Sequence, residues 1–184
     1  MIPLIDKKNL LRIIERIDSG LEGYTKKINL YCIGGTALTL TEKKYSSVDI
    51  DFLVSSEGHT AITSLAAEIG NKEKIKIDVS YDFVVGDSNI SYSLPSDFKE
   101  LSQKLNSLEH LDLYVVCDLD IVITKVLVGR EKDYEDIREL VKKIKIEDIL
   151  KRFQKYVLPP KIKEYLENKL KLSFDRINGS GEVT

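Results

Sequence analysis

Residues 31–54 constrain the fold of this chain more than any other stretch. An apolar, β-rich run over residues 28–33 stops at Gly34-Gly35, a short helical segment follows, and a second apolar run over residues 48–54 carries two aspartates. This pattern predicts a strand, a tight turn, a short helix and a second strand. Adjacent glycines permit backbone conformations that other residues avoid, and they let another group approach the chain closely.

The two aspartates, Asp49 and Asp51, leave the same face of the second predicted strand because side chains alternate along a strand. Carboxylates bind hard cations, and a glycine turn that leads into a helix can hold a phosphate. A lone Asp-x-Asp pair is common on exposed strands and is weak evidence alone. Its position beside the glycine turn, on an apolar strand where unused acids would be costly, favours metal-assisted nucleotidyl or phosphoryl transfer.

Charged residues elsewhere could join these two acids. Asp78 lies in the alternating run 74–80, where it could add a third carboxylate or face water beside Lys76. Three converging acids can hold two divalent ions, one for the attacking oxygen and one for the phosphate chain. Lys125 is the only cation inside the apolar segment 117–129. Its ammonium must therefore reach solvent, pair with an acid or bind a ligand such as a triphosphate.

Smaller polar groups flank these motifs. Asp133 and Asp136 are three residues apart and share a helical face, so they either begin a helix or orient a nearby cation such as Lys125. Ser47 either donates to a phosphate chain or shapes the entry of the strand. Lys44 either contacts the same phosphates or is simply exposed.

The order of the predicted elements divides the chain. Residues 1–116 alternate strands and helices, which predicts an α/β core. A helix over residues 58–69, ended by the Gly-Asn pair that follows, would join parallel strands, and another helix is predicted over residues 96–105. Residues 117–176 are predicted to form an all-helical part, and residues 177–184 a flexible tail.

The totals of the sequence favour a globular, cytoplasmic protein. The chain is 42% apolar and 32% charged, and no apolar run approaches the roughly 20 residues that a membrane helix needs. Cys32 and Cys117 are far apart in apolar surroundings, which is typical of reduced core cysteines. Residues 142–176 hold 11 basic and 5 acidic side chains, a net +6 in a chain of −2. This stretch either meets a polyanion or is a solvated helical surface.

Three blocks of the sequence together resemble the AbiEii-like nucleotidyltransferases of the DNA polymerase β-like superfamily. In the family's order, the blocks are Gly34-Gly35-Thr36-Ala37-Leu38, Ser47-Val48-Asp49-Ile50-Asp51, and Lys125 with the segment 130–137. Many members of this family are toxins of toxin–antitoxin or abortive-infection systems. The family often has an arginine four residues before the first metal-binding aspartate, where this chain has Tyr45.

The resemblance implies a small mixed β-sheet flanked by helices, followed by a helical C-terminal part. Together with the residues above, it gives the nucleotide-binding set Gly34, Gly35, Thr36, Lys44, Ser47, Lys125, Asp133 and Asp136. The implied ligands of Mg²⁺ or Mn²⁺ are Asp49, Asp51 and, by strand position only, Asp78. These three acids and Lys125 would be the catalytic residues.

The expected reaction moves an NMP from an NTP to an acceptor hydroxyl and releases pyrophosphate. The basic C-terminal stretch favours an RNA end, such as a tRNA acceptor stem, as the acceptor. The resemblance also points to a cognate antitoxin protein as a partner. Two alternatives stay open: a catalytically silent binding protein on the same scaffold, and nucleotide transfer to a small molecule or a protein side chain.

Overall fold

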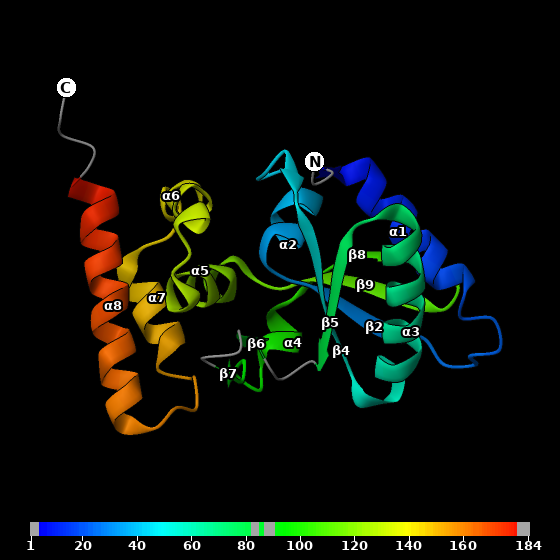
Figure 1. Ribbon diagram of the computed structural model, residues 1–184. Coiled ribbons are helices and arrows are strands. Elements are labelled where there is room, and N and C mark those ends of the chain that lie inside the picture. The colour runs from blue at the N-terminus through cyan, green and yellow to red at the C-terminus, as the bar shows by residue number, and fades with distance from the viewer. Residues whose placement is uncertain (1–3, 82–84, 87–90, 180–184) are drawn as a thin grey trace. The chain divides into compact units, whose positions relative to one another are not determined.

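The computed structural model describes residues 4–81, 85–86 and 91–179. These residues form two compact units, drawn together in Figure 1. The sheet unit contains the described residues up to 81 together with residues 97–117. The helical unit contains residues 85–86, 91–96 and 118–179. Of the predicted tail, residues 180–184 lie outside the described part of the chain.

The sheet unit is built on a five-stranded sheet with the strand order β5-β4-β2-β9-β8. In chain order these strands are β2 (Ile28–Cys32), β4 (Asp49–Val54), β5 (Lys76–Tyr81), β8 (Gln103–Ser107) and β9 (Leu111–Val115). Strand β4 runs parallel to β5 and antiparallel to β2, while β9 runs parallel to β2 and antiparallel to β8. The predicted mixed sheet, with a crossover helix between parallel strands, is confirmed.

Helices and a small second sheet complete this unit. They are α1 (Lys7–Ser19), α2 (Gly34–Leu40), α3 (Ser56–Glu73), α4 (Phe98–Leu101), and the paired strands β1 (Ile5–Asp6) and β3 (Ser46–Ser47). Helices α1 and α3 lie side by side along one face of the sheet (Figure 1). Asp6 caps α1, since its Oδ1 accepts a hydrogen bond from the backbone N–H of Asn9 at 2.8 Å.

The two faces of the sheet differ in character. On β4, the buried side chains of Ile50, Phe52 and Val54 share the face that α3 covers, where Gly58 of α3 packs directly on Ile28 of β2. The alternate positions of β4 carry its two aspartates on the opposite face. The candidate site therefore lies on the face away from α3, in the β2–α2–β4 part of the sheet.

The helical unit is organised around the buried helix α5. Its elements are β6 (Val85–Gly86), β7 (Ser91–Tyr92), α5 (Asp118–Val128), the 3-10 helix η1 (Glu131–Asp133), α6 (Tyr134–Val141), α7 (Ile146–Phe153) and α8 (Pro160–Gly179). Helices α6, α7 and α8 each contact α5. The buried carboxylate of Asp120 accepts hydrogen bonds from Arg152 Nε and from the Tyr156 hydroxyl, both at 2.8 Å, which ties α5 to α7 and the residues after it.

Two predicted helix boundaries were wrong. Helix α3 continues past Gly70-Asn71 to Glu73, and the left-handed turn falls at Lys74, with φ 57°. Gly70 is needed for packing inside the helix, because a Cβ there would lie 2.9 Å from the backbone oxygen of Ile75. Of the predicted helix 96–105, only α4 is helical, and the polar residues after it form the edge strand β8 because they pair with β9.

Within the described part of the chain, no helix combines the length and apolar character needed to cross a membrane.

Candidate functional site

The Gly34-Gly35 pair, which the sequence predicts as a turn, forms the first two residues of α2 and brings two side chains of neighbouring strands close to the backbone. Gly34 has φ +56°, and a Cβ on it would lie 3.3 Å from Asp51 Oδ2. A Cβ on Gly35 would lie 2.6 Å from the hydroxyl oxygen of Ser47. The sequence predicts that some group approaches these glycines, and the approaching groups are this chain's own carboxylate and hydroxyl.

The main chain of Asp51 is bonded to the β2–α2 segment on both sides. Its N–H donates to Thr36 Oγ1 at 2.9 Å, and its carbonyl oxygen accepts from the N–H of Ile33 at 3.3 Å. Thr36 is fully buried. The Gly-Gly-Thr block therefore fixes where Asp51 lies on β4, a role for Thr36 that sequence reasoning missed. Its predicted role at a triphosphate stays a prediction.

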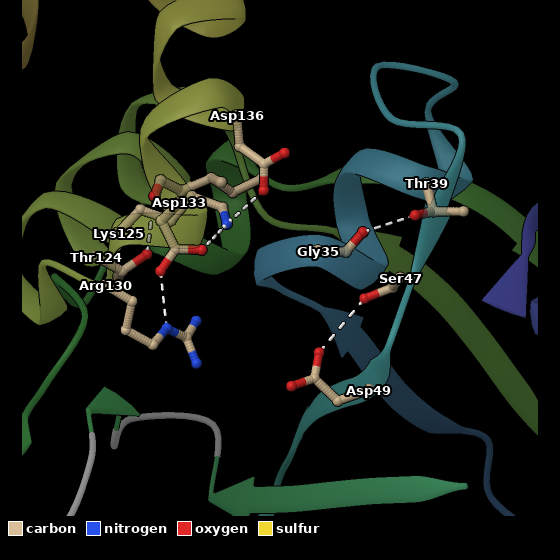
Figure 2. Close-up of polar contacts among 10 residues, drawn as sticks. Gly35, Thr39, Ser47, Asp49, Thr124, Lys125, Arg130, Asp133 and Asp136 are labelled. Atoms are coloured by element: carbon tan, nitrogen blue, oxygen red, sulfur yellow. Dashed lines mark hydrogen bonds and ion pairs between the residues drawn. The ribbon is translucent and has the colours of Figure 1, made fainter. Parts of the chain in front are cut away.

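Asp49 and Asp51 share one face of β4, and both are partly exposed. The Ser47 hydroxyl donates to Asp49 Oδ1 at 3.4 Å (Figure 2). Cys32 is the last residue of β2. Burial is the larger cause, and the charge of Asp51 the smaller, of a raised pKa of its thiol. The thiol therefore stays protonated, and the negative charge in this part of the unit belongs to the carboxylates.

Asp78 joins the two acids through strand register. In the parallel β4–β5 pair, Asp51 lies opposite Asp78 and Asp49 lies opposite Lys76, so all four side chains leave one face. The ammonium of Lys76 contacts Asp78 Oδ2. That hydrogen bond, followed by the charges of Asp78, Asp51 and Asp49, raises the pKa of Lys76. A lysine thus lies in the field of all three carboxylates, at a side-chain exposure of 70%.

The carboxylate pair fits Mg²⁺ or Mn²⁺ by its donor chemistry. Such ions are typically bound by one or two carboxylates together with substrate phosphates rather than by a complete protein cage. Among the residues that the structure describes, no three Asp, Glu, His or Cys side chains converge into a metal-binding group. Asp49 and Asp51 therefore suit a site that the substrate completes. Metal binding by these two residues and by Asp78 stays a prediction.

Lys125 is the centre of a second charged cluster, within the helical unit. Its side chain is 4% exposed, and its Nζ donates to Asp133 Oδ1 at 2.6 Å and to Asp136 Oδ2 at 2.8 Å (Figure 2). Arg130 Nε donates to the second oxygen of Asp133 at 2.8 Å. Of the three roles that the sequence left open for Lys125, pairing with acids is the one observed.

The electrostatics of this cluster favour its charged form. Burial opposes ionisation of Asp133, but the hydrogen bonds from Arg130 and Lys125 and their positive charges outweigh burial and lower the pKa of Asp133. The four residues of the cluster come from α5, η1, α6 and the position just before η1. The Lys…Asp-x-x-Asp pattern thus fastens the start of α6 to the buried helix α5.

The class of this protein follows from a family match over most of its chain. A family model described as "Nucleotidyltransferase of unknown function (DUF6036)" matches residues 8–179. The protein belongs to this family.

Two further similarities are more distant. A crystal structure of a candidate nucleotidyltransferase from Thermotoga maritima matches 76% of this chain and 97% of its own, at 15% identity and a TM-score of 0.48. A glutamyl-tRNA reductase from Methanococcus maripaludis is 29% identical over 86 residues, which cover 41% of this chain. The match spans only 22% of the reductase's length.

Proposed function

We propose that this protein is a metal-dependent nucleotidyltransferase that transfers an NMP from an NTP to a hydroxyl at an RNA end, in the manner of AbiEii-like toxins. The observation that carries the proposal is the pair Asp49 and Asp51, placed on one face of β4 beside a Gly-Gly turn that contacts both strands. Membership of a nucleotidyltransferase family supports the reaction class.

In the proposed reaction, Asp49 and Asp51 would hold Mg²⁺ or Mn²⁺. The metal would polarise the phosphoryl oxygens and offset the charge that develops on them. The acceptor oxygen attacks the α-phosphorus of the NTP, a new P–O bond forms, the bond to the β-phosphate oxygen breaks, and pyrophosphate leaves. Asp78 accepts the hydroxyl proton once its contact with Lys76 has opened.

The proposed nucleotide contacts follow the sequence blocks. Phosphates would lie along the Gly34-Gly35 turn, near Thr36, Lys44 and Ser47. Lys125, Asp133 and Asp136 enter the proposal from the sequence pattern alone. Lys125 would offset charge on the triphosphate after exchanging one of its carboxylate partners. A cognate antitoxin that blocks the nucleotide or RNA site would be the natural regulator of such an activity.

A labelling experiment tests this proposal. The protein is incubated with each labelled NTP, with Mg²⁺ or Mn²⁺ and with total RNA. We expect wild type to label RNA and the Asp49→Asn/Asp51→Asn variant to lose this by on the order of 10³-fold or more, since the metal contributes several kcal/mol. The matched control is Asp112→Asn, which removes a strand carboxylate that is paired with Lys104 on β8.

Equal labelling by wild type and the double variant, or labelling by neither, would refute the proposal. Label on a small molecule or a protein would refute only the RNA acceptor. Circular dichroism of every variant separates loss of chemistry from loss of fold.

A second candidate is a binding protein that keeps the scaffold without catalysis. It is favoured by the lysines at both clusters: Lys76 contacts Asp78, and Lys125 is held by two carboxylates. Calorimetry with NTP and Mg²⁺ separates the candidates. A silent scaffold should show no NTP binding that depends on Asp49 and Asp51. The enzyme should bind NTP, and the Asp49→Asn/Asp51→Asn variant should lose that binding.

A further inference from the structure

A cavity of about 540 Å³ lies on the sheet unit, between the first turn of α1 and the loop that follows α2. Its lining comprises the first residues of α1, Thr39 of α2, and residues 42–45 of the loop. Thr39 also reaches the Gly-Gly turn, because its hydroxyl donates to the carbonyl of Gly35 at 2.9 Å (Figure 2). The cavity and the carboxylate site are therefore joined through one short helix.

The cavity is electropositive. Its lining holds Lys7, Lys8, Lys43 and Lys44 against Asp6 and Glu42, a formal charge of +2. Both acids are engaged in local contacts: Asp6 caps α1, and Glu42 pairs with Lys7 at 3.1 Å. The N-terminus of α1 adds partial positive charge, and the first turn of this 13-residue helix carries no acid. The cavity therefore favours an anion.

The loop that forms the cavity has a defined shape. The N–H groups of Lys43 and Lys44 donate to the carbonyl of Leu38 at 2.9 and 3.2 Å. Glu42 adopts the left-handed conformation, with φ 59°, and the next residues after the loop, in β3, pair with β1. Backbone contacts thus position the lysines before a ligand arrives, which lowers the entropic cost of binding.

An aromatic ring stands at the edge of this cavity. Tyr45 is 87% exposed, so the face of its ring is accessible to a ligand. A phosphate alone needs no ring, whereas a single-stranded nucleic acid uses both a basic groove for its phosphates and aromatic faces for its bases. The combination therefore points to a strand with bases rather than to a small inorganic anion.

The length of α2, which runs from the two glycines to the loop of the cavity, suits an acceptor strand. Helix α2 has 7 residues, of which the two glycines are the first, and the loop follows it, so it is about 10 Å long at about 1.5 Å per residue. That length corresponds to about three nucleotides of a stacked strand. Tyr45 also precedes Asp49 by four residues of chain.

We infer that this lysine-lined cavity binds the single-stranded end of the acceptor RNA, with phosphates against Lys8 and Lys43 and a base stacked on Tyr45. The choice of RNA as ligand rests on the proposed function. The binding itself requires neither metal nor catalysis, so it is measurable separately.

Fluorescence anisotropy with a short, labelled single-stranded RNA, without NTP or metal, tests the inference on the full chain. We expect Tyr45→Ala to weaken binding roughly 5- to 150-fold and Tyr45→Phe to leave it nearly unchanged, because stacking needs the ring and not the hydroxyl. Lys8→Ala/Lys43→Ala should lower the slope of log affinity against log salt by about 1.4, since each phosphate contact contributes about 0.7. Lys44 is not substituted, because in the proposed function it contacts the phosphates of the NTP.

The matched control is Lys26→Ala/Lys72→Ala, which removes the same charge from exposed positions outside the cavity. Absence of RNA binding by wild type, or equal losses in the cavity and control variants, would overturn the inference. A separate calorimetric titration of the same variants with NTP would also overturn it if NTP affinity fell while RNA affinity was unchanged, because the cavity would then hold the nucleotide. RNA binding that depends on the cavity, in a protein that labels nothing, would sustain the inference and refute the proposed function.

Discussion

Asp51 and Lys125 are both predicted site residues, yet the two units hold them in opposite ways. Asp51 is held through its main chain, by Thr36 Oγ1 and the N–H of Ile33. Lys125 is held through its charged atom, by two carboxylates. The bonds from Thr36 and Ile33 therefore fix the position of Asp51 on β4 through the backbone. A residue fixed by its functional group must exchange partners before it can meet a ligand.

The largest effect should follow from breaking the Lys125 cluster. Lys125 and Arg130 both donate to the buried carboxylate of Asp133. Lys125→Met removes one of these two cations, so we expect a loss of about 3–5 kcal/mol in the free energy of unfolding. Urea titration measures this loss. The matched control is Lys171→Met, which breaks an exposed pair with Glu167 and should cost at most about 1 kcal/mol.

The pH dependence of that loss has a definite sign. The pKa of Asp133 is lowered in the fold, so its stabilising contribution is present above the unfolded value of about 3.9 and is lost as pH falls through the folded value. The gap between wild type and Lys125→Met should therefore narrow in acid. A gap that is constant with pH, or a loss no larger than that of the control, would show that the cluster is not a stabilising ion pair.

A smaller effect is expected at Thr36. Thr36→Val removes the acceptor for the Asp51 N–H, which should cost about 1–3 kcal/mol of stability. If Asp51 is catalytic, its displacement should also lower the transfer rate roughly 10- to 100-fold. Thr36→Ser should restore both, and Thr41→Val serves as control because that hydroxyl bonds only within and around its own helix. Stability lost without loss of rate would separate Thr36 from the chemistry.

The smallest change in stability is expected at Lys76. Its pair with Asp78 is exposed, so Lys76→Met should alter unfolding by at most about 1 kcal/mol. Removing an ammonium from the field of three carboxylates should nevertheless raise Mn²⁺ affinity, by roughly 3- to 10-fold. Calorimetry measures this, with Lys104→Met as the matched exposed lysine. Unchanged affinity would mean that these acids do not form the cation site.

The sequence correctly predicted the features that depend on side-chain periodicity and on the local order of helices and strands. Alternation placed Asp49 and Asp51 on one face, and the run 74–80 correctly predicted a strand that pairs with β4. Helical spacing put Asp133 and Asp136 together, and both contact Lys125.

Contacts between segments that are far apart in the chain could not be predicted from the sequence. Nothing local to Thr36 shows that its hydroxyl will meet the N–H of a residue 15 positions later, since that bond depends on how β2 and β4 align. The Asp120–Arg152–Tyr156 network likewise joins elements across 32 and 36 positions of chain. Gly70 predicts a helix end because glycine often ends helices, whereas in the structure it makes room for a neighbouring carbonyl.

The backbone anchoring of Asp51 has a practical consequence for finding the unknown acceptor. Because the bonds from Thr36 and Ile33 reach the main chain, Asp51→Asn removes charge without removing what aligns β4 with α2. An inactive chain of this kind would stay folded and keep its remaining contacts with substrate. Immobilised and exposed to cellular RNA, it would act as bait that retains its acceptor instead of releasing it as product.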